Sequence, residues 1–233
     1  MTRRSNGPAH KSARWAGLLL AAPLVIAASP ADDFRHGLAH WRAEAEAPAQ
    51  ITAQGGILDI VAPKGLTLWY DRPLTGPVEI DYDVEAVAEG GVDDAVSDVN
   101  AFWMASDADD PGATHPPRPR SGRFADYDDL RTYYVGIGGN RNSTTRLRRY
   151  VGQAGDRPIL PGNDRRDAAA LLQPNRWMHI RLIADGHRVA VLRDGKMLFG
   201  LDDDAPYRHG YFALRTTASH LRVRRLRIRS VTP

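Results

Sequence analysis

The sequence predicts an all-β domain, a sandwich or jelly roll of antiparallel strands, and three observations carry this prediction. Apolar residues mostly alternate at period two, which is typical of half-buried strands. Glycine, proline and aspartate residues separate these short runs, so the strands follow one another at close spacing. Two Asp-Gly pairs, Asp185-Gly186 and Asp194-Gly195, stand between short β runs and indicate tight hairpins.

The alternating runs are predicted as strands in this order: 57–61, 66–70, 78–87, 99–105, 132–138, 145–151, 178–184, 188–193, 197–201, 211–216 and 221–228. Turn sequences such as Pro63-Lys64-Gly65 stand between them. Only segment 167–172 has a helical composition, so βαβ units are not expected. Two long loops, 107–124 and 152–167, interrupt the series, and such loops in a compact domain are usually functional or disordered.

The first 31 residues have the pattern of an export signal. A small-residue stretch, 29–31, follows an apolar run, 15–28, which is shorter than the roughly 20 residues of a comfortable transmembrane helix. We therefore expect a signal peptide over 1–31, a single β-sandwich over 32–233, and a periplasmic or extracellular protein without a stable membrane anchor after cleavage. A membrane anchor or an amphipathic first helix is the alternative. The basic residues before the apolar run are Arg3, Arg4, Lys11 and Arg14.

Removing the signal changes the interpretation of the charge. The whole chain carries a formal charge of +3, but residues 1–31 contribute four basic residues and no acidic one. The remaining domain is close to neutral, so nucleic acid is not an expected partner. The chain has no cysteine, which excludes disulfides, thiolate metal sites and a thiol nucleophile.

The predicted strand 99–105 contains a polar residue among apolar ones. Asn100, Phe102 and Met104 are expected on one face, and Trp103 with its small neighbours on the other. A buried asparagine is costly unless its amide is hydrogen-bonded. Asn100 is therefore expected either to bond a neighbouring loop or to face a ligand groove.

The next two strands add an aromatic residue and two arginines. In 132–138, Tyr133 is expected to face the core and Tyr134 the other side, where its ring can serve as a platform for a sugar. In 145–151, Arg146, Arg148 and Tyr150 share one face. Two arginines in register can bind a carboxylate through forked hydrogen bonds, although charged strand faces are more often simply solvated. The long loops on either side are expected to wall a cleft there.

The C-terminal arginines are assigned to structure. They alternate with apolar residues over 221–229, which is the pattern of a half-buried strand with its charges outward, protecting a sheet edge. The adjacent Arg224-Arg225 pair suggests a β-bulge.

No metal or other cofactor is expected. No histidine pair has a zinc-like spacing, and only His115, in the proline-rich loop, is a candidate proton shuttle. His179 is assigned to the surface. The acidic residues near 93–98 and 107–110 can be solvated loop charges, and Ca²⁺ binding is the alternative.

Several motifs resemble known protein families. The Asn-x-Trp at 175–177 with the two following Asp-Gly turns looks like the concanavalin A-like (laminin-G-like) lectin and glucanase fold. The motif Arg120-x-Gly122-x-Phe124-x-x-Tyr127, followed by Thr-Thr-Arg-Leu-Arg-Arg-Tyr at 144–150, resembles secreted bacterial domains similar to YesU-like proteins of rhamnogalacturonan-utilisation loci. This resemblance implies a jelly-roll sandwich of two antiparallel sheets and a polysaccharide or oligosaccharide partner. Some relatives are described as lyases that act on uronic-acid-linked rhamnose.

The first functional hypothesis is therefore a lyase that cleaves a uronic-acid-containing glycan by β-elimination. Such a reaction needs a cation at the carboxylate, a base for the α-proton and an acid for the leaving oxygen. Arg146 and Arg148 are assigned to the carboxylate, and Tyr127 or Tyr134, with a pKa lowered by a neighbouring arginine, to the proton transfers. The remaining candidates are His115 as reserve acid or base, with Asn100, Arg120, Asn140, Asn142 and Tyr150 as substrate-binding residues.

Two alternatives use the same surface. A non-catalytic carbohydrate-binding module needs the rings and amides but no base. A glycoside hydrolase of the same fold needs two facing carboxylates, and it is disfavoured because the chain has no glutamate after Glu89. A structural or adhesive envelope protein is a weaker third alternative.

Overall fold

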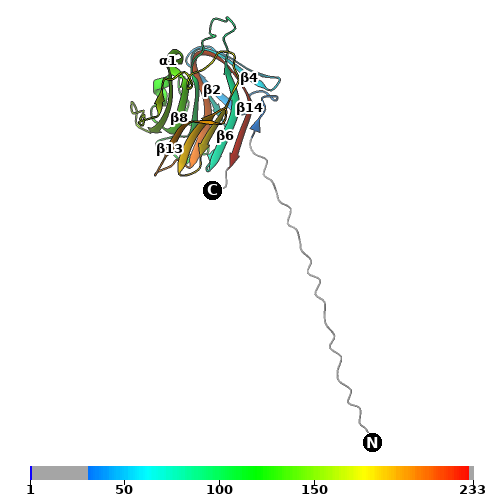
Figure 1. Ribbon diagram of the computed structural model, residues 1–233, viewed down its shortest axis with the longest axis vertical. Helices are drawn as coiled ribbons and strands as arrows, with labels where there is room; N and C mark the ends of the chain where they lie inside the picture. The colour runs from blue at the N-terminus through cyan, green and yellow to red at the C-terminus, as the bar shows by residue number, and fades with distance from the viewer. Residues whose placement is uncertain (2–30, 231–233) are drawn as a thin grey trace.

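The computed structural model describes Met1 and residues 31–230 (Figure 1). Residues 2–30, which form nearly all of the expected signal peptide, lie outside the described part. No helix among the described residues is long and apolar enough to cross a membrane.

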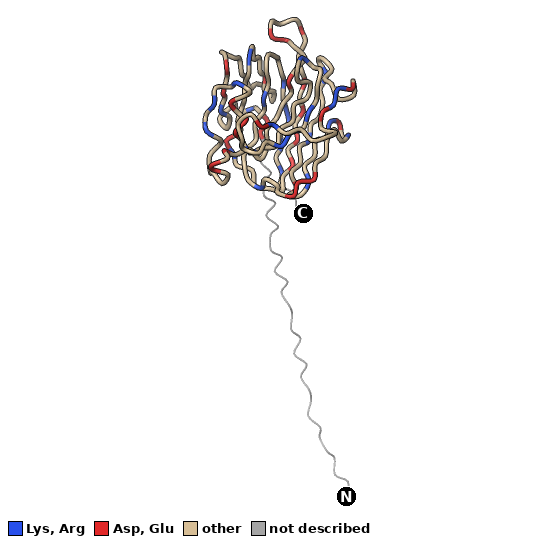
Figure 2. The backbone as a smooth tube through the Cα atoms, turned by 90° about the vertical axis from the view of Figure 1, so that its left-hand side faces the viewer, with Lys and Arg blue, Asp and Glu red and all other residues tan. Residues whose placement is uncertain are grey.

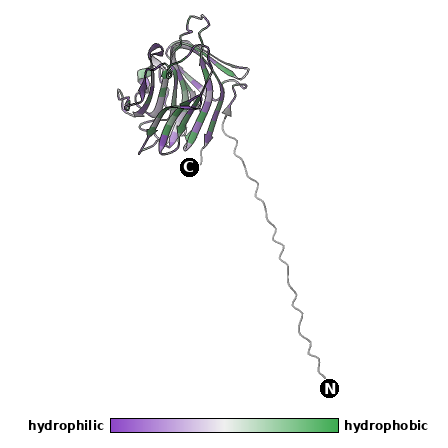
Figure 3. Cartoon of the chain, viewed as in Figure 1, coloured by the Kyte–Doolittle hydropathy of each residue, from purple (hydrophilic) through white to green (hydrophobic). Residues whose placement is uncertain are grey.

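The regular secondary structure of the described chain is almost entirely β, as the alternating pattern predicts (Figure 3). Hydrophobic and hydrophilic residues alternate along many of the strands. The strands are β1 (Ala31–Asp32), β2 (Trp41–Ala45), β3 (Gln50–Gln54), β4 (Ile57–Tyr70), β5 (Leu74–Thr75), β6 (Val78–Ala86), β7 (Val99–Asp107), β8 (Leu130–Gly138), β9 (Thr144–Val151), β10 (Asp164–Arg165), β11 (Met178–Ala184), β12 (Arg188–Arg193), β13 (Lys196–Asp202) and β14 (His209–Ser230). A 3₁₀ turn, η1 (Phe124–Tyr127), and a four-residue element, α1 (Gly139–Asn142), complete the set.

The strands form one curled antiparallel sheet that folds into two layers. The pocket layer has the order β10-β9-β8-β7-β14-β4-β2, and the second layer has the order β13-β12-β11-β6-β14-β4-β3. The two layers are continuous because β4 and β14 run through both. β14 pairs with β7 over Tyr211–Arg215 and with β6 over Leu221–Ser230. The all-β antiparallel prediction is confirmed.

These two long strands are the main difference from the sequence prediction, which divided each of them in two. The expected turn at Pro63 lies inside β4. The pairing of β4 with β14 changes register there, from Gly65 opposite Thr217 to Ala62 opposite Ser219. Proline has no N–H to donate to a ladder, so a register shift is where a long strand can contain one.

The short helix expected over 167–172 is not formed. The segment makes only turns with i→i+3 hydrogen bonds, from Ala170 N to Asp167 O and from Leu171 N to Ala168 O. The Arg193 guanidinium donates to carbonyls of this segment, including that of Leu171 at 3.0 Å, and so fixes the turns against β12.

The main core lies between the two layers, and β7 contributes to it in an unexpected way. Met104 was expected to share a face with Asn100, but it packs in the core with Trp103, while Ala105 joins Phe102 on the opposite face. A register shift between Trp103 and Ser106, together with a positive φ of 53° at Met104, reverses the alternation. A β-bulge has this effect because it inserts one extra residue.

The C-terminal arginines lie on a central strand, so their assignment to edge protection is wrong. β14 has β6 on one side and β4 on the other, and the suggested bulge is present between Arg224 and Arg227. The carboxylate of Asp83, buried on β6, forms hydrogen bonds with Arg224, Arg225 and His179. The carboxylate of Asp81 forms hydrogen bonds with His179, Arg181 and Arg229. Figure 2 shows basic and acidic positions intermingled along the chain, as this cross-strand pairing requires.

Candidate functional site

A pocket of about 650 Å³ opens on the outer face of the pocket layer, the face turned away from the second layer. Its floor comes from β7, β8 and β9. Its walls come from α1, from the loop before β7, from the middle of β14 and from η1. The lining residues are Ala95, Val96, Ser97, Asp98, Asn100, Phe124, Tyr134, Gly136, Gly139, Asn140, Arg141, Thr144, Arg146, Arg148, Thr217 and Ala218.

Sheet register explains why this floor is polar. Asn100 stands opposite Gly136, which stands opposite Arg146, so one row across three neighbouring strands carries an amide, a glycine and a guanidinium. The next row pairs Tyr134 with Arg148. Residues directly opposite on neighbouring strands point to the same face. Five candidates from the sequence therefore line one pocket: Asn100, Tyr134, Asn140, Arg146 and Arg148.

The two pocket arginines have different partners. Arg146 forms a two-pronged ion pair with Asp164 on β10, with Nε and Nη2 at 3.0 and 3.1 Å from the carboxylate oxygens. Arg148 donates only to the backbone carbonyl of Arg157, and among the described residues no carboxylate lies within ion-pair distance of it. Burial lowers the pKa of Arg148, which shows that its charge is poorly solvated.

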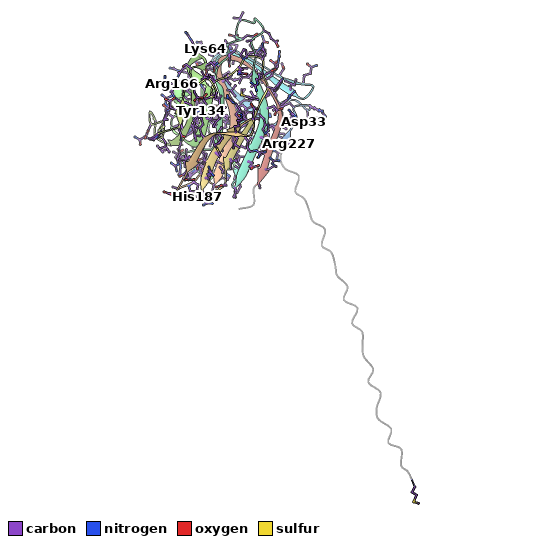
Figure 4. The ribbon with its side chains drawn as sticks, in the orientation of Figure 1. Asp33, Lys64, Tyr134, Arg166, His187 and Arg227 are labelled. Atoms are coloured by element: carbon purple, nitrogen blue, oxygen red, sulfur yellow. The ribbon has the colours of Figure 1, made fainter. Side chains whose placement is uncertain are left out.

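Tyr134 presents a hydroxyl that has no hydrogen-bond partner among the described residues, and Figure 4 places this residue inside the outline of the domain. The hydroxyl lies over Gly136, where an added Cβ would be 2.7 Å from Tyr134 Oη and 3.1 Å from Asn100 Oδ1. Asn100 Oδ1 is buried and also unpartnered in the described part of the chain, while its Nδ2 donates to Asp98 at 3.2 Å. The Tyr134 hydroxyl therefore lies at the floor, next to a buried acceptor.

The expectation that an arginine lowers the tyrosine pKa is wrong for Tyr134. Burial raises its pKa well above 10, and this outweighs the opposing effect of Arg215 and Arg148. The hydroxyl is therefore protonated at neutral pH, so it can donate a proton or a hydrogen bond but is not a ready base.

Asp98 is a pocket residue that the sequence argument did not select. Burial raises the pKa of its carboxyl, against the lowering effect of hydrogen bonds from Ser97 and Asn100. Its φ of 55° lies in the left-handed region. The sequence considered Asp98 only as part of an acidic run, although its position two residues before Asn100 could have indicated it.

Four of the ten non-glycine residues with a positive φ in the described chain line the pocket. Besides Asp98, the lining residues Asn140, Arg141 and Ala218 have φ values of 54°, 57° and 48°. Non-glycine residues in this region cost on the order of 1–2 kcal/mol each, so they persist only where the surroundings impose them. Such residues are typical of binding and catalytic sites.

The two other tyrosine candidates lie beneath the surface and do not line the pocket. Tyr127 is fully buried and donates to Glu44 Oε2 at 2.7 Å, and Tyr150 is fully buried against Phe102 and Tyr134. Burial raises the pKa of both hydroxyls. Their positions fit an aromatic support under the pocket floor.

The remaining three candidates also lie outside the lining. Arg120 pairs with Asp107 and Asp129, each at 2.7 Å. Asn142 bonds the backbone of Leu172 twice, accepting from its N–H at 2.8 Å and donating to its carbonyl at 3.0 Å. His115 is exposed in its loop, where Nδ1 lies 3.0 Å from the carbonyl of Pro116. The proposed roles of Arg120 and Asn142 in substrate binding and of His115 in proton transfer stay predictions.

The two long loops differ in their contribution. The first, which we call the strap (residues 108–129), supplies Phe124, whose ring packs on Tyr134 with centroids 5.4 Å apart. The second does not line the pocket. It contributes β10, whose Asp164 holds Arg146 from outside.

Each acidic run contains carboxylates that accept hydrogen bonds from protein groups. Asp107 accepts from the Arg118 backbone and from Arg120. Among the described residues, no group of three or more histidine, cysteine, aspartate or glutamate side chains is arranged to hold a metal ion.

Asp94 anchors the loop that leads into the pocket wall at 95–98. It accepts backbone N–H groups from Gly91 at 2.9 Å and Glu89 at 2.8 Å, and it lies 2.7 Å from His220 Nδ1. His220 also faces Asp59 on β4, at 3.0 Å. The bond from Gly91 and the His220 contact hold the pKa of Asp94 at about 2.

The low pKa of Asp94 predicts a pH-dependent contribution to stability. A carboxylate whose pKa is lowered on folding stabilises the native state above its unfolded pKa, and this contribution is lost as the pH falls toward about 2. Asp94→Asn should therefore lower the unfolding free energy near roughly pH 5, with the difference from the native chain vanishing as the solution approaches that acid limit. Urea unfolding across this range measures it. Asp93→Asn is the control, because the Asp93 carboxylate accepts no hydrogen bond among the described residues, and equal behaviour of the two variants would contradict the anchor.

The fold and the family of the chain follow from its similarity to known proteins. The fold is that of the galectin and concanavalin A-like lectins. The chain belongs to the family described as Domain of unknown function (DUF6250), whose model matches residues 60–226. No curated protein matches the sequence.

Three solved structures illustrate the similarity of fold. A Bacillus subtilis protein of unknown function with a galectin-like fold is 16% identical, with a TM-score of 0.62 over 83% of this chain and 90% of that one. A Bacillus subtilis carbohydrate-binding module is 9% identical, with a TM-score of 0.54 over 82% and 96%. The exoplasmic/lumenal domain of VIP36, in a Ca²⁺/Man-bound form, is 10% identical, with a TM-score of 0.54 over 83% and 84%.

Proposed function

We propose that this protein is exported and binds an acidic glycan in the pocket on the outer face of the pocket layer. The observation that carries the proposal is Arg148, a partly buried guanidinium beside the pocket with no carboxylate partner among the described residues. A uronic acid supplies a carboxylate of the right charge and planar shape. The arginines 141, 146 and 148 outnumber the single lining carboxylate, Asp98, which favours an anion over a cation.

Sugar hydroxyls fit the rest of the floor. A hydroxyl both donates and accepts, so a sugar hydroxyl can accept a hydrogen bond from Tyr134, whose hydroxyl has no partner among the described residues. The Phe124 and Tyr134 rings offer apolar faces to the C–H side of a sugar ring. Several solved structures of this fold are described as carbohydrate-binding or carbohydrate recognition domains, which supports a glycan partner. The resemblance to YesU-like proteins points to rhamnogalacturonan-type glycans as a first choice.

Calorimetry with the purified domain 32–233 tests the binding proposal. We expect uronate-containing oligosaccharides to bind about tenfold or more tightly than neutral ones of equal length, because a charge-assisted hydrogen bond contributes about 1.5–3 kcal/mol. The preference should weaken as salt is added. Equal binding of neutral and acidic series would contradict the role of the arginines. Export is tested separately by sequencing the N-terminus of the protein recovered from the cell envelope, which should start at Asp32.

A second candidate function, β-elimination, is favoured by Asp98. In this reaction Asp98 would remove the proton α to the carboxylate, the C–O bond to the leaving oxygen would break with its electron pair, and Tyr134 would protonate that oxygen as the double bond forms. Arg146 and Arg148 would stabilise the charge that develops on the carboxylate. A two-carboxylate hydrolase is less well supported, because Asp98 is the one carboxyl lining the described pocket.

The raised pKa of Asp98 predicts the pH profile of a lyase. A base must be deprotonated, so the rate should fall with decreasing pH, with a midpoint above the ordinary 3.8 of an aspartate. Ultraviolet absorbance of the unsaturated uronate measures the rate. Asp98→Asn should abolish it while leaving acidic glycans bound. If the native domain binds these glycans and no absorbance develops, the protein is a binding module.

A further inference from the structure

The strap lies across the outer face of the pocket layer and is bonded to strands far from its own ends. Tyr211 on β14 donates its hydroxyl to the carbonyl of Ala113 at 3.5 Å, and Arg42 on β2 donates to the carbonyl of Pro117. The strap therefore reaches from β7 to the β2 edge of this layer and returns to β8.

A pair of glycines seats the strap closely against the sheet. At Gly122, whose φ is +89°, an added Cβ would lie 2.4 Å from the Glu46 backbone N, and at Gly65 an added Cβ would lie 2.3 Å from the Gly122 carbonyl oxygen. Both positions can hold only glycine without a backbone shift. The same Gly122 carbonyl accepts a hydrogen bond of 3.0 Å from Arg215, a fully buried residue of β14.

Aromatic rings fill the space under the strap. Phe124 packs against the Arg215 guanidinium at 5.1 Å and against Arg157 at 5.0 Å. Tyr127 stacks on Phe102 of β7, with ring centroids 5.5 Å apart. These side chains are buried or partly buried together, so they fill the space between the strap and the sheet.

The strap therefore covers the sheet on the side of β14, and the pocket floor does not extend beyond it. The polar row that begins at Arg146 and passes through Gly136 and Asn100 continues in register to Arg215 and Thr67. Arg215 and Thr67 are buried and bonded to each other at 2.6 Å, beneath Gly122. In an unobstructed sheet this row would form a continuous surface across the strands, but here it stops at Asn100.

Both ends of β8 also have walls. The α1 turn, with left-handed φ values at 140–142, stands at one end of β8, and the segments 95–98 and 217–218 stand beside β7 and β14. Phe124 closes the direction toward the opposite end of β8. Walls therefore stand on the side of β14 and at both ends of β8, whereas no segment beyond β9 lines the pocket. A linear chain that enters from the side of β9 meets a wall opposite.

We propose that the pocket binds the end of an acidic glycan chain, a terminal uronic acid with its immediate neighbour, and excludes internal segments of a polymer. This proposal rests on the proposed function of the pocket. Its volume lies within the range of about 300–1,000 Å³ that is usual for small-molecule sites. The strap is the element that changes a sheet surface into a blind pocket.

The test uses the native domain, so that it does not depend on a variant that folds. Oligogalacturonates and oligoglucuronates of two to ten sugars are titrated by calorimetry, together with the same oligomers chemically capped at the reducing end or at the non-reducing end. We expect one molecule of protein per chain and a molar affinity that stays within about twofold from three sugars upward. One of the two caps should weaken binding by a hundredfold or more, and the other should have no effect.

The outcomes separate the two proposals. If long chains bind several protein molecules and neither cap matters, the pocket accepts internal segments and the chain-end inference is overturned while glycan binding stands. If no member of either series nor a neutral oligosaccharide panel binds, the proposed function itself is overturned, and the inference with it. A Phe124→Ala variant supplies a second measurement. Removal of this wall should reduce the loss of affinity that the cap causes, and an unchanged loss would show that Phe124 does not form the wall.

Discussion

Replacing Arg148 with methionine should weaken the binding of uronate oligosaccharides by about ten- to a hundredfold, the equivalent of one charge-assisted hydrogen bond. The domain should keep its stability, because Arg148 has no carboxylate partner that would be left unpaired among the described residues. Removing a poorly solvated charge is often neutral or even stabilising when the replacement packs well. Calorimetry measures the affinity, and urea unfolding measures the stability.

Two further variants make this experiment specific. Arg227→Met carries the same substitution on an exposed position of the second layer and should bind like the native domain. Arg148→Lys keeps the charge but loses the fork, so its affinity should fall between those of the native domain and the methionine variant. Native affinity in Arg148→Met would show that the carboxylate binds elsewhere.

Gly122→Ala should destabilise the domain by roughly 2–4 kcal/mol, because the new Cβ would overlap backbone atoms of Ala45 and Glu46 and the residue would keep a left-handed φ. Backbone atoms cannot rotate away as a flexible side chain can. The matched control is Gly112→Ala in the same strap, where no atom lies within 4 Å of the added Cβ. That control should change stability by less than about 0.5 kcal/mol. Equal stability of the two variants would show that the strap is not seated at Gly122.

The sequence predicts the fold well where structure is local. The Asp-Gly pairs and alternating residues give β11 and β12 with the correct ends, because a tight hairpin is specified by its own residues. The continuity of β4 and β14 is not predictable in this way. It depends on bulges that become visible only when two distant strands are paired, such as Ala62 with Ser219. The placement of Met104 on the core face, opposite to the predicted one, also results from a bulge that the sequence alone does not reveal.

The pocket was partly predictable for a related reason. Asn100, Tyr134, Arg146 and Arg148 lie on consecutive antiparallel strands, so period two alone brings them to one face. The positions of the other candidate residues depend on partners that are distant in the sequence. Tyr127 is held by Glu44, which lies 83 positions away along the chain, and nothing in the sequence near Tyr127 indicates that contact. Arg215 was missed because its neighbours within β14 look like ordinary core.

The most direct test of the central claim, that the outer-face pocket binds an acidic glycan, is a nuclear magnetic resonance titration of the labelled domain with a trigalacturonate or triglucuronate. The account predicts that the backbone amide of Gly136, the side-chain amide of Asn100 and the Nε–H of Arg148 shift together and saturate at one ligand per protein. Shifts confined to the second layer, for example at His179 and Arg181, or the absence of any saturable shift with either ligand, would contradict it.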